Sequence, residues 1–437
     1  MKIDRKIVAL LLVVLCVLGC IAAVPTLFKG NTEYKAALND ARNYAEKSLC
    51  TLSIQSYQKA LAEEDTIELE LELAEVYQKG LEDGELSKSQ VAAFYEALID
   101  NFKREPKAYD RALGYYLSIE DYETLSSIIA QANKLEIKSD GITTAINVLK
   151  TKYKAEYSGL PEAKRSLQGT YIVKDDEHYY IYNEKIQAQT GDVYDYASPF
   201  TDGKALVKKN GYTFLVNGNG IREAYFDNEI TESTGVGCEL IGCKSGDIYS
   251  YYNLAGEKVF GEYLFAGRFF DNLAAVQTAE GWQVIDNTGK VVSPQSYEDI
   301  KLGLSYECCP GGIIFAKENG KYKMFDKSMN RVGSAEFDDC DAFLSADWLA
   351  AVKAGEKWGF VSSKGETVIE PKYDTAKSFS NGLAAVTEGE ACSFINVNDE
   401  KIITGTFLEG GYFSAAGKCL VRNQTFWQPI ERYYTGM

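Results

Sequence analysis

A regular repeat of about 35 residues in the second half of the chain constrains its fold most. Short β-prone segments recur there, and each is followed by a turn that contains glycine. The segments end at Val173, Val207, Ile241, Val276, Phe315, Val352, Val386 and Val421. Successive ends are 34 or 35 residues apart, except for spacings of 39 before Phe315 and 37 after it. This regularity predicts about eight β-rich units over residues 169–437.

The most complete unit covers residues 349–386. Residues 357–361 read Lys-Trp-Gly-Phe-Val, a turn follows at 362–365, and a second β-prone segment covers 367–373. The next unit then begins with Leu-Ala-Ala-Val at 383–386. Three short β-prone segments separated by glycine-containing turns predict a small antiparallel meander.

The turn after the Lys-Trp-Gly segment has equivalents in other units. Each equivalent begins with Asn, Asp or Ser and ends with glycine, at Gly256, Gly289 and Gly365. The first side chain can accept backbone N–H hydrogen bonds, and glycine adopts the left-handed conformation that a bulged hairpin needs. We therefore expect these glycines to have a structural role.

Aromatic residues mark two further repeat positions. Tyr373 and Phe379 are six residues apart, and the same spacing recurs in Tyr194/Phe200, Tyr263/Phe269, Phe337/Phe343 and Phe407/Phe413. Trp358-Gly359 has a partial equivalent in Trp282, which is followed by glutamine. In other units the tryptophan position holds Tyr179, Tyr249, Tyr322 or Cys392. Because the tryptophan is replaceable, we interpret it as a packing residue and not as a reactive group.

The unit at 349–386 resembles a bacterial WG repeat, and the resemblance extends over residues 169–437. Proteins of that family are mostly inferred binders, so the resemblance implies a binding function without naming a ligand. Units with exposed strand edges must close into a ring or stack openly. We favour a closed, propeller-like array, with an open β-solenoid as the alternative. A ligand site is expected among residues that break the period, and Tyr251, Tyr252, Tyr433 and Tyr434 are candidates for stacking on sugars.

The N-terminus carries a long apolar segment. Residues 7–28 are uncharged and follow three basic residues within 1–6. About 20 apolar residues span the hydrocarbon core of a bilayer, and preceding basic residues favour a cytoplasmic N-terminus. The segment therefore predicts a single-pass anchor at the cell membrane, with the bulk of the protein outside the cytoplasm. A lipoprotein anchored at Cys20 and a cleaved signal peptide are the alternatives.

Residues 31–160 have helical periodicity. Two segments resemble tetratricopeptide repeats: one contains Ala41, Tyr44, Tyr57 and Ala60, and the other contains Tyr116, Ile129 and Ala132. The resemblance implies paired helices with possible peptide-binding character. A plain helical bundle that acts as a spacer is the alternative. The expected fold class is thus multidomain: a transmembrane helix, an all-α tetratricopeptide-like region and an all-β repeat domain.

The residue composition argues against several kinds of chemistry. The single histidine, His178, lies in a polar turn sequence, and triads or multi-histidine metal sites need more imidazoles. Among the ten cysteines, the eight outside residues 7–28 lack metal-ligand spacing and are expected to be buried free thiols. A net charge of −17 disfavours nucleic-acid partners. We predict no catalytic residue, no metal and no cofactor.

The remaining functional hypotheses differ in class. The preferred one is a non-enzymatic binding or scaffold protein of the cell envelope, with a protein or envelope ligand. An enzyme alternative is a carboxylate-dependent glycan hydrolase that uses the cluster Asp338, Asp339, Asp341 and Asp347. Because Asp338 aligns with Asp195 and Asp374, we interpret it as a repeat turn residue. A sensory subunit of an envelope signalling complex is the third hypothesis.

Overall fold

The protein is described from a computed structural model that covers residues 32–155, 160, 162–165, 169–175, 177–345, 347–423 and 426–435. The chain divides into two compact units, which meet in the sequence between Leu149 and Lys150. The β-rich unit therefore begins earlier than the residue 169 expected from the repeat. The first unit is called the helical unit below, and the second the β unit.

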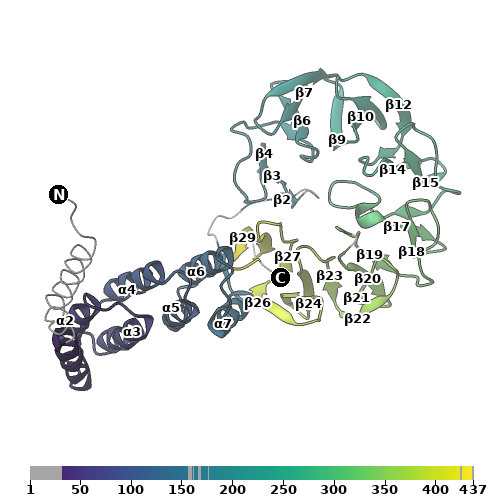
Figure 1. Ribbon diagram of the computed structural model, residues 1–437. Coiled ribbons are helices and arrows are strands. Elements are labelled where there is room, and N and C mark those ends of the chain that lie inside the picture. Colours follow the sequence, from purple (N-terminus) through teal and green to yellow (C-terminus); the bar gives the residue numbers. More distant parts are fainter. Residues whose placement is uncertain are drawn as a thin grey trace, which may run out of the picture. The chain divides into compact units, whose positions relative to one another are not determined.

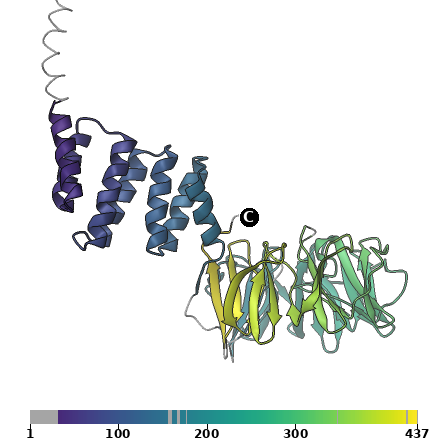
Figure 2. The same cartoon turned by 90° about the horizontal axis from the view of Figure 1, so that it is seen from below.

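The helical unit is a row of helices joined by short turns. The helices are 32–46, α2 (Cys50–Leu61), α3 (Ile67–Glu82), α4 (Lys88–Asn101), α5 (Pro106–Ser118), α6 (Tyr122–Lys134) and α7 (Asp140–Leu149). From α2 onward each helix packs on the next, and α5 also contacts α3 and α7 (Figure 2). Fully buried alanines, such as Ala60, Ala112 and Ala132, allow this close approach.

The sequence explains where these helices begin. Thr66 caps α3 by accepting a hydrogen bond from the Leu69 N–H, and Asp121 caps α6 through the Thr124 N–H. Ser87 and Gln90 form a reciprocal capping box at the start of α4. Pro106 occupies the first turn of α5, where its missing N–H costs nothing.

The predicted fold class is corrected with respect to its transmembrane helix. In the described ranges, none of the helices is both long and apolar enough to cross a membrane. α3 has 16 residues, or about 24 Å at the α-helical rise, and it carries several glutamates. Residues 1–6 and 7–28, including Cys20, lie outside the described residues. The predicted single-pass localisation at the cell membrane is corrected on the same finding.

The β unit consists of antiparallel sheets of three or four strands, and the described residues contain eight of them. The first four sheets are β2 (Glu162–Arg165), β3 (Tyr171–Lys174) and β4 (Tyr179–Tyr182); β5 (Tyr196–Ala197), β6 (Lys204–Lys209), β7 (Tyr212–Asn217) and β8 (Arg222–Phe226); β9 (Ile230–Gly237), β10 (Leu240–Ser245), β11 (Ile248–Asn253) and β12 (Lys258–Tyr263); and β13 (Phe265–Ala266), β14 (Leu273–Thr278) and β15 (Gly281–Asp286).

The second four sheets follow the same order. They are β16 (Asp299–Ile300), β17 (Ile313–Glu318) and β18 (Lys321–Asp326); β19 (Asp339–Cys340), β20 (Ala350–Ala354), β21 (Lys357–Val361) and β22 (Thr367–Tyr373); β23 (Thr375–Ala376), β24 (Ala384–Glu388), β25 (Ala391–Ile395) and β26 (Lys401–Phe407); and β27 (Glu409–Gly410), β28 (Lys418–Arg422), β29 (Trp427–Arg432) and β1 (Tyr153–Ala155). A short 3₁₀ helix, η1 (Pro310–Gly312), precedes β17.

The sheets follow one another around a ring. Figure 1 shows first strands such as β9 and β19 toward its centre and last strands such as β12 and β22 on its rim. One sequence repeat contributes strands to two successive sheets. Residues 350–373 form β20 to β22, and the next strand, β23, has two residues and is the first strand of the following sheet. The buried valines that define the period lie on the second strands, for example Val352 on β20.

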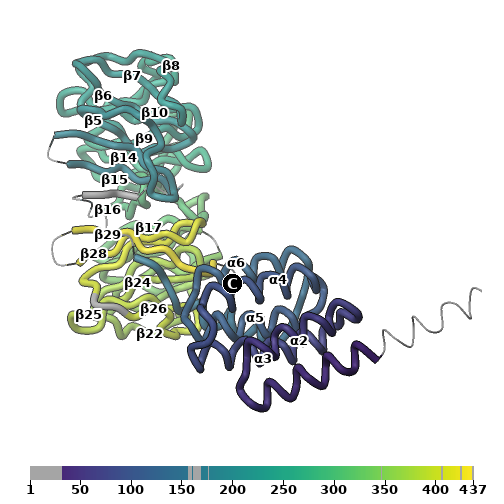
Figure 3. Tube along the Cα trace, turned by 90° about the vertical axis from the view of Figure 1, so that its left-hand side faces the viewer, coloured from purple at the N-terminus to yellow at the C-terminus, as the bar shows by residue number. Residues whose placement is uncertain are grey.

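The ring is closed by the two ends of the β unit. β1, from its start, pairs with β29, from its end, so that β1 becomes the fourth strand of the last sheet. Figure 3 shows β28 and β29 in yellow within the array. Leu420 of β28 packs with Tyr171 and Val173 of the first sheet, and Ser414 donates a hydrogen bond to the Glu184 carbonyl. The propeller-like arrangement favoured from the sequence is confirmed, and the open solenoid is excluded.

The motif residues support the meander as expected. Gly256, Gly289 and Gly365 have φ values of 88°, 86° and 80°. The first turn residue accepts backbone hydrogen bonds; for example, Asp286 accepts from Thr288 and Lys290. Trp358 and Trp282 are half-buried packing residues.

Gly359 is required by the close approach of β22 to β21. A Cβ atom there would lie 2.5 Å from the Ile369 carbonyl oxygen, at a point where the register of the two strands shifts. The paired aromatics Tyr373 and Phe379 are fully buried, and both pack against Phe360.

Candidate ligand pocket in the β unit

A pocket of about 470 Å³ lies against the first strands of three successive sheets. Tyr196 comes from β5, residues 231–234 from β9 and Phe265 from β13, while Tyr306 comes from the loop between β16 and η1. The remaining lining residues are Ile172, Lys174, Tyr179, Ala197, Pro199, Tyr249 and Leu304. Aromatic side chains from five different segments therefore face one space.

The rings are placed by contacts with one another. The ring centres of Tyr179 and Tyr196 are 5.7 Å apart, and those of Tyr249 and Phe265 are 5.2 Å apart. Phe265 also meets Tyr306 at 5.9 Å. All three pairs are tilted, which is a favourable arrangement for aromatic rings. The wall of the pocket is thus a set of rings held by their neighbours.

Hydrogen bonds hold two of the phenols in place. The Tyr196 hydroxyl accepts a hydrogen bond from the Ser233 N–H at 2.7 Å and donates to the Ser233 carbonyl at 3.2 Å. The Tyr249 hydroxyl donates to a Glu232 carboxylate oxygen at 2.9 Å. Burial raises the pKa of both tyrosines well above the ordinary value, and Glu232 adds to the rise at Tyr249. Both hydroxyls therefore stay protonated at neutral pH.

Charged groups of both signs lie at the same pocket. The Lys174 ammonium is 5.3 Å from the centre of the Tyr179 ring, a cation–π distance. Glu232, which also lines the pocket, forms an ion pair with Lys244 at 3.5 Å, and its side chain is 53% exposed. The chemistry of the lining suits an apolar or aromatic group that carries a polar edge.

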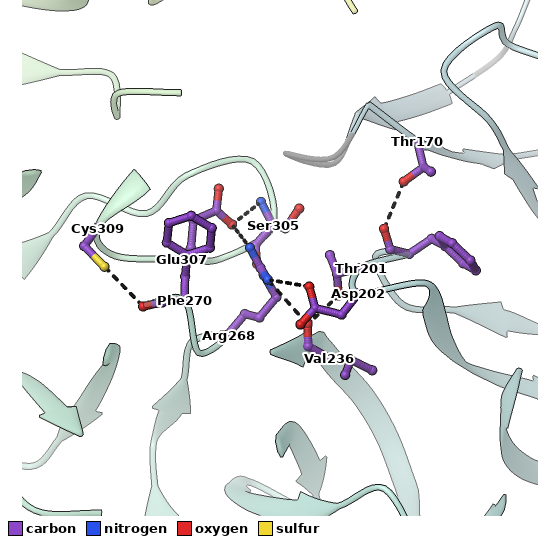
Figure 4. A network of polar contacts seen from close by, with 10 residues as sticks. Thr170, Thr201, Asp202, Val236, Arg268, Phe270, Ser305, Glu307 and Cys309 are labelled. Carbon is purple, nitrogen blue, oxygen red and sulfur yellow. Dashed lines mark hydrogen bonds and ion pairs between the residues drawn. The ribbon is translucent and has the colours of Figure 1, made fainter. Parts of the chain in front are cut away.

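The loop at 301–312 accounts for the irregular spacing before Phe315. It contributes Leu304 and Tyr306 to the pocket. A buried ion pair anchors it: Arg268 is 1% exposed, Glu307 is fully buried, and their charged groups are 3.4 Å apart (Figure 4). Arg268 also donates hydrogen bonds to the Ser305 and Val236 carbonyls. One guanidinium thus connects the loop to β9.

Glu307 is held from several sides within this loop. One carboxylate oxygen accepts a hydrogen bond from the Ser305 N–H at 3.0 Å, and the Gly303 N–H donates to the Glu307 carbonyl at 2.7 Å. Burial raises the pKa of the Glu307 carboxyl, and Arg268 offsets part of that rise. The Phe270 ring lies 5.4 Å from the guanidinium. The loop over the pocket is therefore fixed by interactions beneath it.

The acidic residues considered for catalysis have structural contacts. Asp338 pairs with Lys321 and accepts a hydrogen bond from the Gly355 N–H. Asp374 and Asp195 accept the equivalent bonds from the Gly389 and Asn210 N–H groups, so the interpretation of Asp338 as a repeat turn residue agrees with its geometry.

Two further acidic residues of the cluster also form ion pairs or hydrogen bonds within the fold. Asp339 pairs with Lys301 at 2.9 Å, and Asp341 accepts hydrogen bonds from the Ser378 N–H and the Tyr412 hydroxyl. Asp347 is exposed.

Other predicted positions do not line the pocket. His178 is half-exposed in the β3–β4 turn, where its N–H donates to Asp175. The eight cysteines among the described residues are free, and all but Cys238 are buried. The prediction that Tyr251 stacks on sugars is wrong, because this side chain is fully buried and its hydroxyl donates a hydrogen bond to the Gly267 carbonyl.

Part of the pocket is indicated by irregularities in the sequence repeat. The spacing of 39 residues marked the segment that contains Leu304 and Tyr306. Tyr179 and Tyr249 occupy the repeat's tryptophan position, for which the sequence pattern predicts a packing role alone, whereas both line the pocket. The replacement of tryptophan by tyrosine at two such positions is the sequence feature that could have indicated a binding role.

The comparisons with known proteins concern the β unit. The family model described as "WG containing repeat" matches residues 193–212 and 358–390. No curated protein matches the chain. The match confirms the prediction of WG-type repeats at these two segments. It includes neither residues 7–28 nor the helical unit, so the membrane anchor and the tetratricopeptide resemblance gain no support from it.

Three solved structures are similar at low sequence identity. The β-propeller domain of Cps50 (Swd1) from Myceliophteria thermophila is 9% identical, with 63% of this chain and 97% of that chain covered and a TM-score of 0.35. The Pan2 WD40 domain from Neurospora crassa is 12% identical, with coverages of 53% and 86% and a TM-score of 0.31. A eukaryotic initiation factor is 12% identical, with coverages of 66% and 88% and a TM-score of 0.40. By its strand pairing the β unit is a propeller-like array, and two of its segments, residues 193–212 and 358–390, match the WG-containing repeat.

Proposed function

We propose that this protein is a non-enzymatic binding scaffold whose partner is a protein segment that inserts an apolar or aromatic side chain into the pocket of the β unit. The observation that carries the proposal is the convergence of Tyr179, Tyr196, Tyr249, Phe265 and Tyr306 on one space of about 470 Å³. Pockets of this size with aromatic walls and a few polar groups are the usual form of ligand sites.

The partner class follows from the lining. Buried aromatic residues commonly supply most of the binding energy at protein interfaces. Lys174 and Glu232 present opposite charges at one pocket, which suits the mixed polar rim of a protein contact. The net charge of −17 disfavours a polyphosphate partner, so nucleic acid is not proposed.

A binding function is preferred to catalysis because of what the candidate acids do. Asp338, Asp339 and Asp341 each hold a turn or a neighbouring strand through hydrogen bonds or ion pairs. The two pocket phenols with hydrogen-bond partners stay protonated at neutral pH. No observation on the described residues favours the glycan hydrolase or the sensory subunit.

The test is to block the pocket by changing its inserted loop. Leu304→Asp places a charge at the lining, and we expect it to reduce partner capture by the full-length protein at least about tenfold. Leu408→Asp is the matched control, because Leu408 is 44% exposed and does not line the pocket. Capture would be measured from extracts of the source cells, followed by titration of the purified partner.

Two results would overturn the proposal. The first is equal capture by wild type and Leu304→Asp. The second is binding or cleavage of envelope oligosaccharides by the wild type, reduced by Leu304→Asp, with no protein captured. Thermal unfolding of both variants would show that each remains folded.

A further inference from the structure

A groove in the helical unit, separate from the pocket of the β unit, has a different chemistry. It measures about 620 Å³ and lies between α2, α3 and α4. Much of its lining is apolar or aromatic: Ile54, Leu61, Leu73, Tyr77, Leu86, Ala93, Phe94 and Ala97. The polar lining is Thr51, Gln55, Gln58, Glu70, Glu85 and Gln90. The charged residues that line it are therefore both acidic.

Glu70 is an unsatisfied carboxylate in this groove. Its side chain belongs to a residue that is only 8% exposed, and its Oε2 atom is buried with no hydrogen-bond partner in the described part of the chain. Glu70, Leu73 and Tyr77 share one face of α3, because they are three and seven residues apart. A buried polar atom without a partner costs free energy, so its presence calls for an explanation.

The neighbouring glutamates of α3 show how unusual this is. Glu68 forms an ion pair with Lys107 at 3.1 Å, and Glu72 forms one with Arg42 at 2.8 Å. Both pairs are exposed at the surface, where ion pairs contribute little. The more buried Glu70 instead has the like charge of Asp65 nearby. Burial, with Asp65, raises the pKa of Glu70 to about 7. A cation supplied from outside would satisfy this carboxylate.

We propose that the groove binds a peptide segment that inserts a lysine or arginine side chain to pair with Glu70. The hydrocarbon stem of such a side chain would lie along Leu73 and Ile54, as long cationic side chains do on apolar surfaces. The rings of Tyr77 and Phe94 are stacked at 4.2 Å and add an aromatic wall. A groove of about 620 Å³ across three helices accommodates more than one side chain, which favours a peptide over a free amine.

The test uses calorimetric titration of the full-length protein with a blocked tripeptide, Leu-Lys-Leu. We expect the analogue with norleucine in place of lysine to bind about tenfold or more weakly, because a hydrogen-bonded charge pair is lost. Glu70→Gln should remove this difference between the two peptides. Glu68→Gln is the matched control on the same helix and should keep it.

Different results would overturn different parts of the proposal. Equal binding of the lysine and norleucine peptides to the wild type, or no binding of either, would overturn the proposal. Unchanged discrimination in Glu70→Gln would exclude Glu70 as the partner of the cation. Binding of n-butylamine as tight as that of the tripeptide would assign the site to free amines and overturn the peptide assignment. Since these variants lie in the helical unit, their outcome is independent of the test with Leu304→Asp.

Discussion

Each unit of the protein contains a buried glutamate, and the two differ in whether a cationic side chain lies beside the carboxylate. Glu307 in the β unit faces Arg268 at 3.4 Å and accepts a hydrogen bond from the Ser305 N–H. Glu70 in the helical unit has no counter-charge within the described residues, and in each of the two glutamates one carboxylate oxygen lacks a hydrogen bond. Burial raises the pKa of both carboxyls, so both are costly to ionise.

The difference separates a structural charge from a candidate ligand site. Arg268 and Glu307 form a buried ion pair and fix the loop that carries Leu304 and Tyr306. Each of the two charges has its counter-charge within the fold, although the Glu307 Oε1 atom is buried without a hydrogen bond, and the pair supports the shape of the pocket. Glu70 lacks a counter-charge and lines a groove that a peptide can enter. A buried charge thus indicates a ligand only when the fold does not neutralise it.

The largest expected effect on stability is from removing the arginine of the buried ion pair. Arg268→Met leaves Glu307 buried without its counter-charge, and we expect the β unit to lose about 3–5 kcal/mol of unfolding free energy. Urea denaturation followed by tyrosine fluorescence would measure it. A loss below about 1 kcal/mol would contradict the role assigned to the pair.

The double variant Arg268→Met/Glu307→Leu is the control for this prediction. It replaces both charges by apolar side chains, and such replacements are often neutral or stabilising. We expect it to recover most of the stability lost in the single variant. Failure to recover would mean that the guanidinium's hydrogen bonds to Ser305 and Val236, or its ion pair with Asp202, matter more than its pairing with Glu307.

The second prediction concerns Glu70, whose replacement we expect to increase the unfolding free energy. Glu70→Gln removes an unpaired buried charge, so it should stabilise the helical unit by about 3 kcal/mol at most at pH 8. The native carboxyl binds a proton more tightly than the unfolded one, with a pKa of about 7 against 4.5. Wild-type stability therefore falls as the pH rises from 4.5 to 7, and the variant lacks this fall.

The measurement is the loss of helical circular dichroism in urea at several pH values. The gain of Glu70→Gln should be absent below about pH 4 and complete above about pH 7 to 8. Glu68→Gln should show no such gain, since Glu68 is an exposed, paired residue. Destabilisation by Glu70→Gln at pH 8 would remove the contrast between the two carboxylates.

The smallest effect is expected at a surface pair. Lys327 and Asp271 are 3.2 Å apart in the β unit, and both side chains are about half-exposed. Lys327→Ala should change the unfolding free energy by less than about 1 kcal/mol, because solvent screens exposed charges. The same denaturation experiment sets the scale for Arg268→Met. A comparable loss in both would show that burial is not what distinguishes the two ion pairs.

Local patterns predicted much of the β unit. The period located the second strands, the turn glycines have the expected positive φ values, and Asp338 caps a turn as its alignment indicated. These features depend on residues that are close in the sequence. The residue pattern at 357–361 also pointed to the family whose model matches there.

The candidate sites were harder to predict because their residues are distant in the sequence. Tyr179 and Tyr306 are more than a hundred residues apart and share one pocket. Glu70 lies among alternating glutamates, and nothing in that pattern distinguishes it from Glu68 or Glu72. The prediction of a membrane-spanning helix rested on residues 7–28, and the described helices include none that is long and apolar enough.

By itself, the sequence determined the repeat, its turns and the alternation of buried and exposed strand residues, because these follow from the conformational preferences of adjacent residues. The tertiary structure alone decided that β1 completes the last sheet, which of the rings converge on one pocket, and which buried glutamate lacks a counter-charge. Burial and pairing depend on which distant segments meet in space, and a linear pattern does not contain that information.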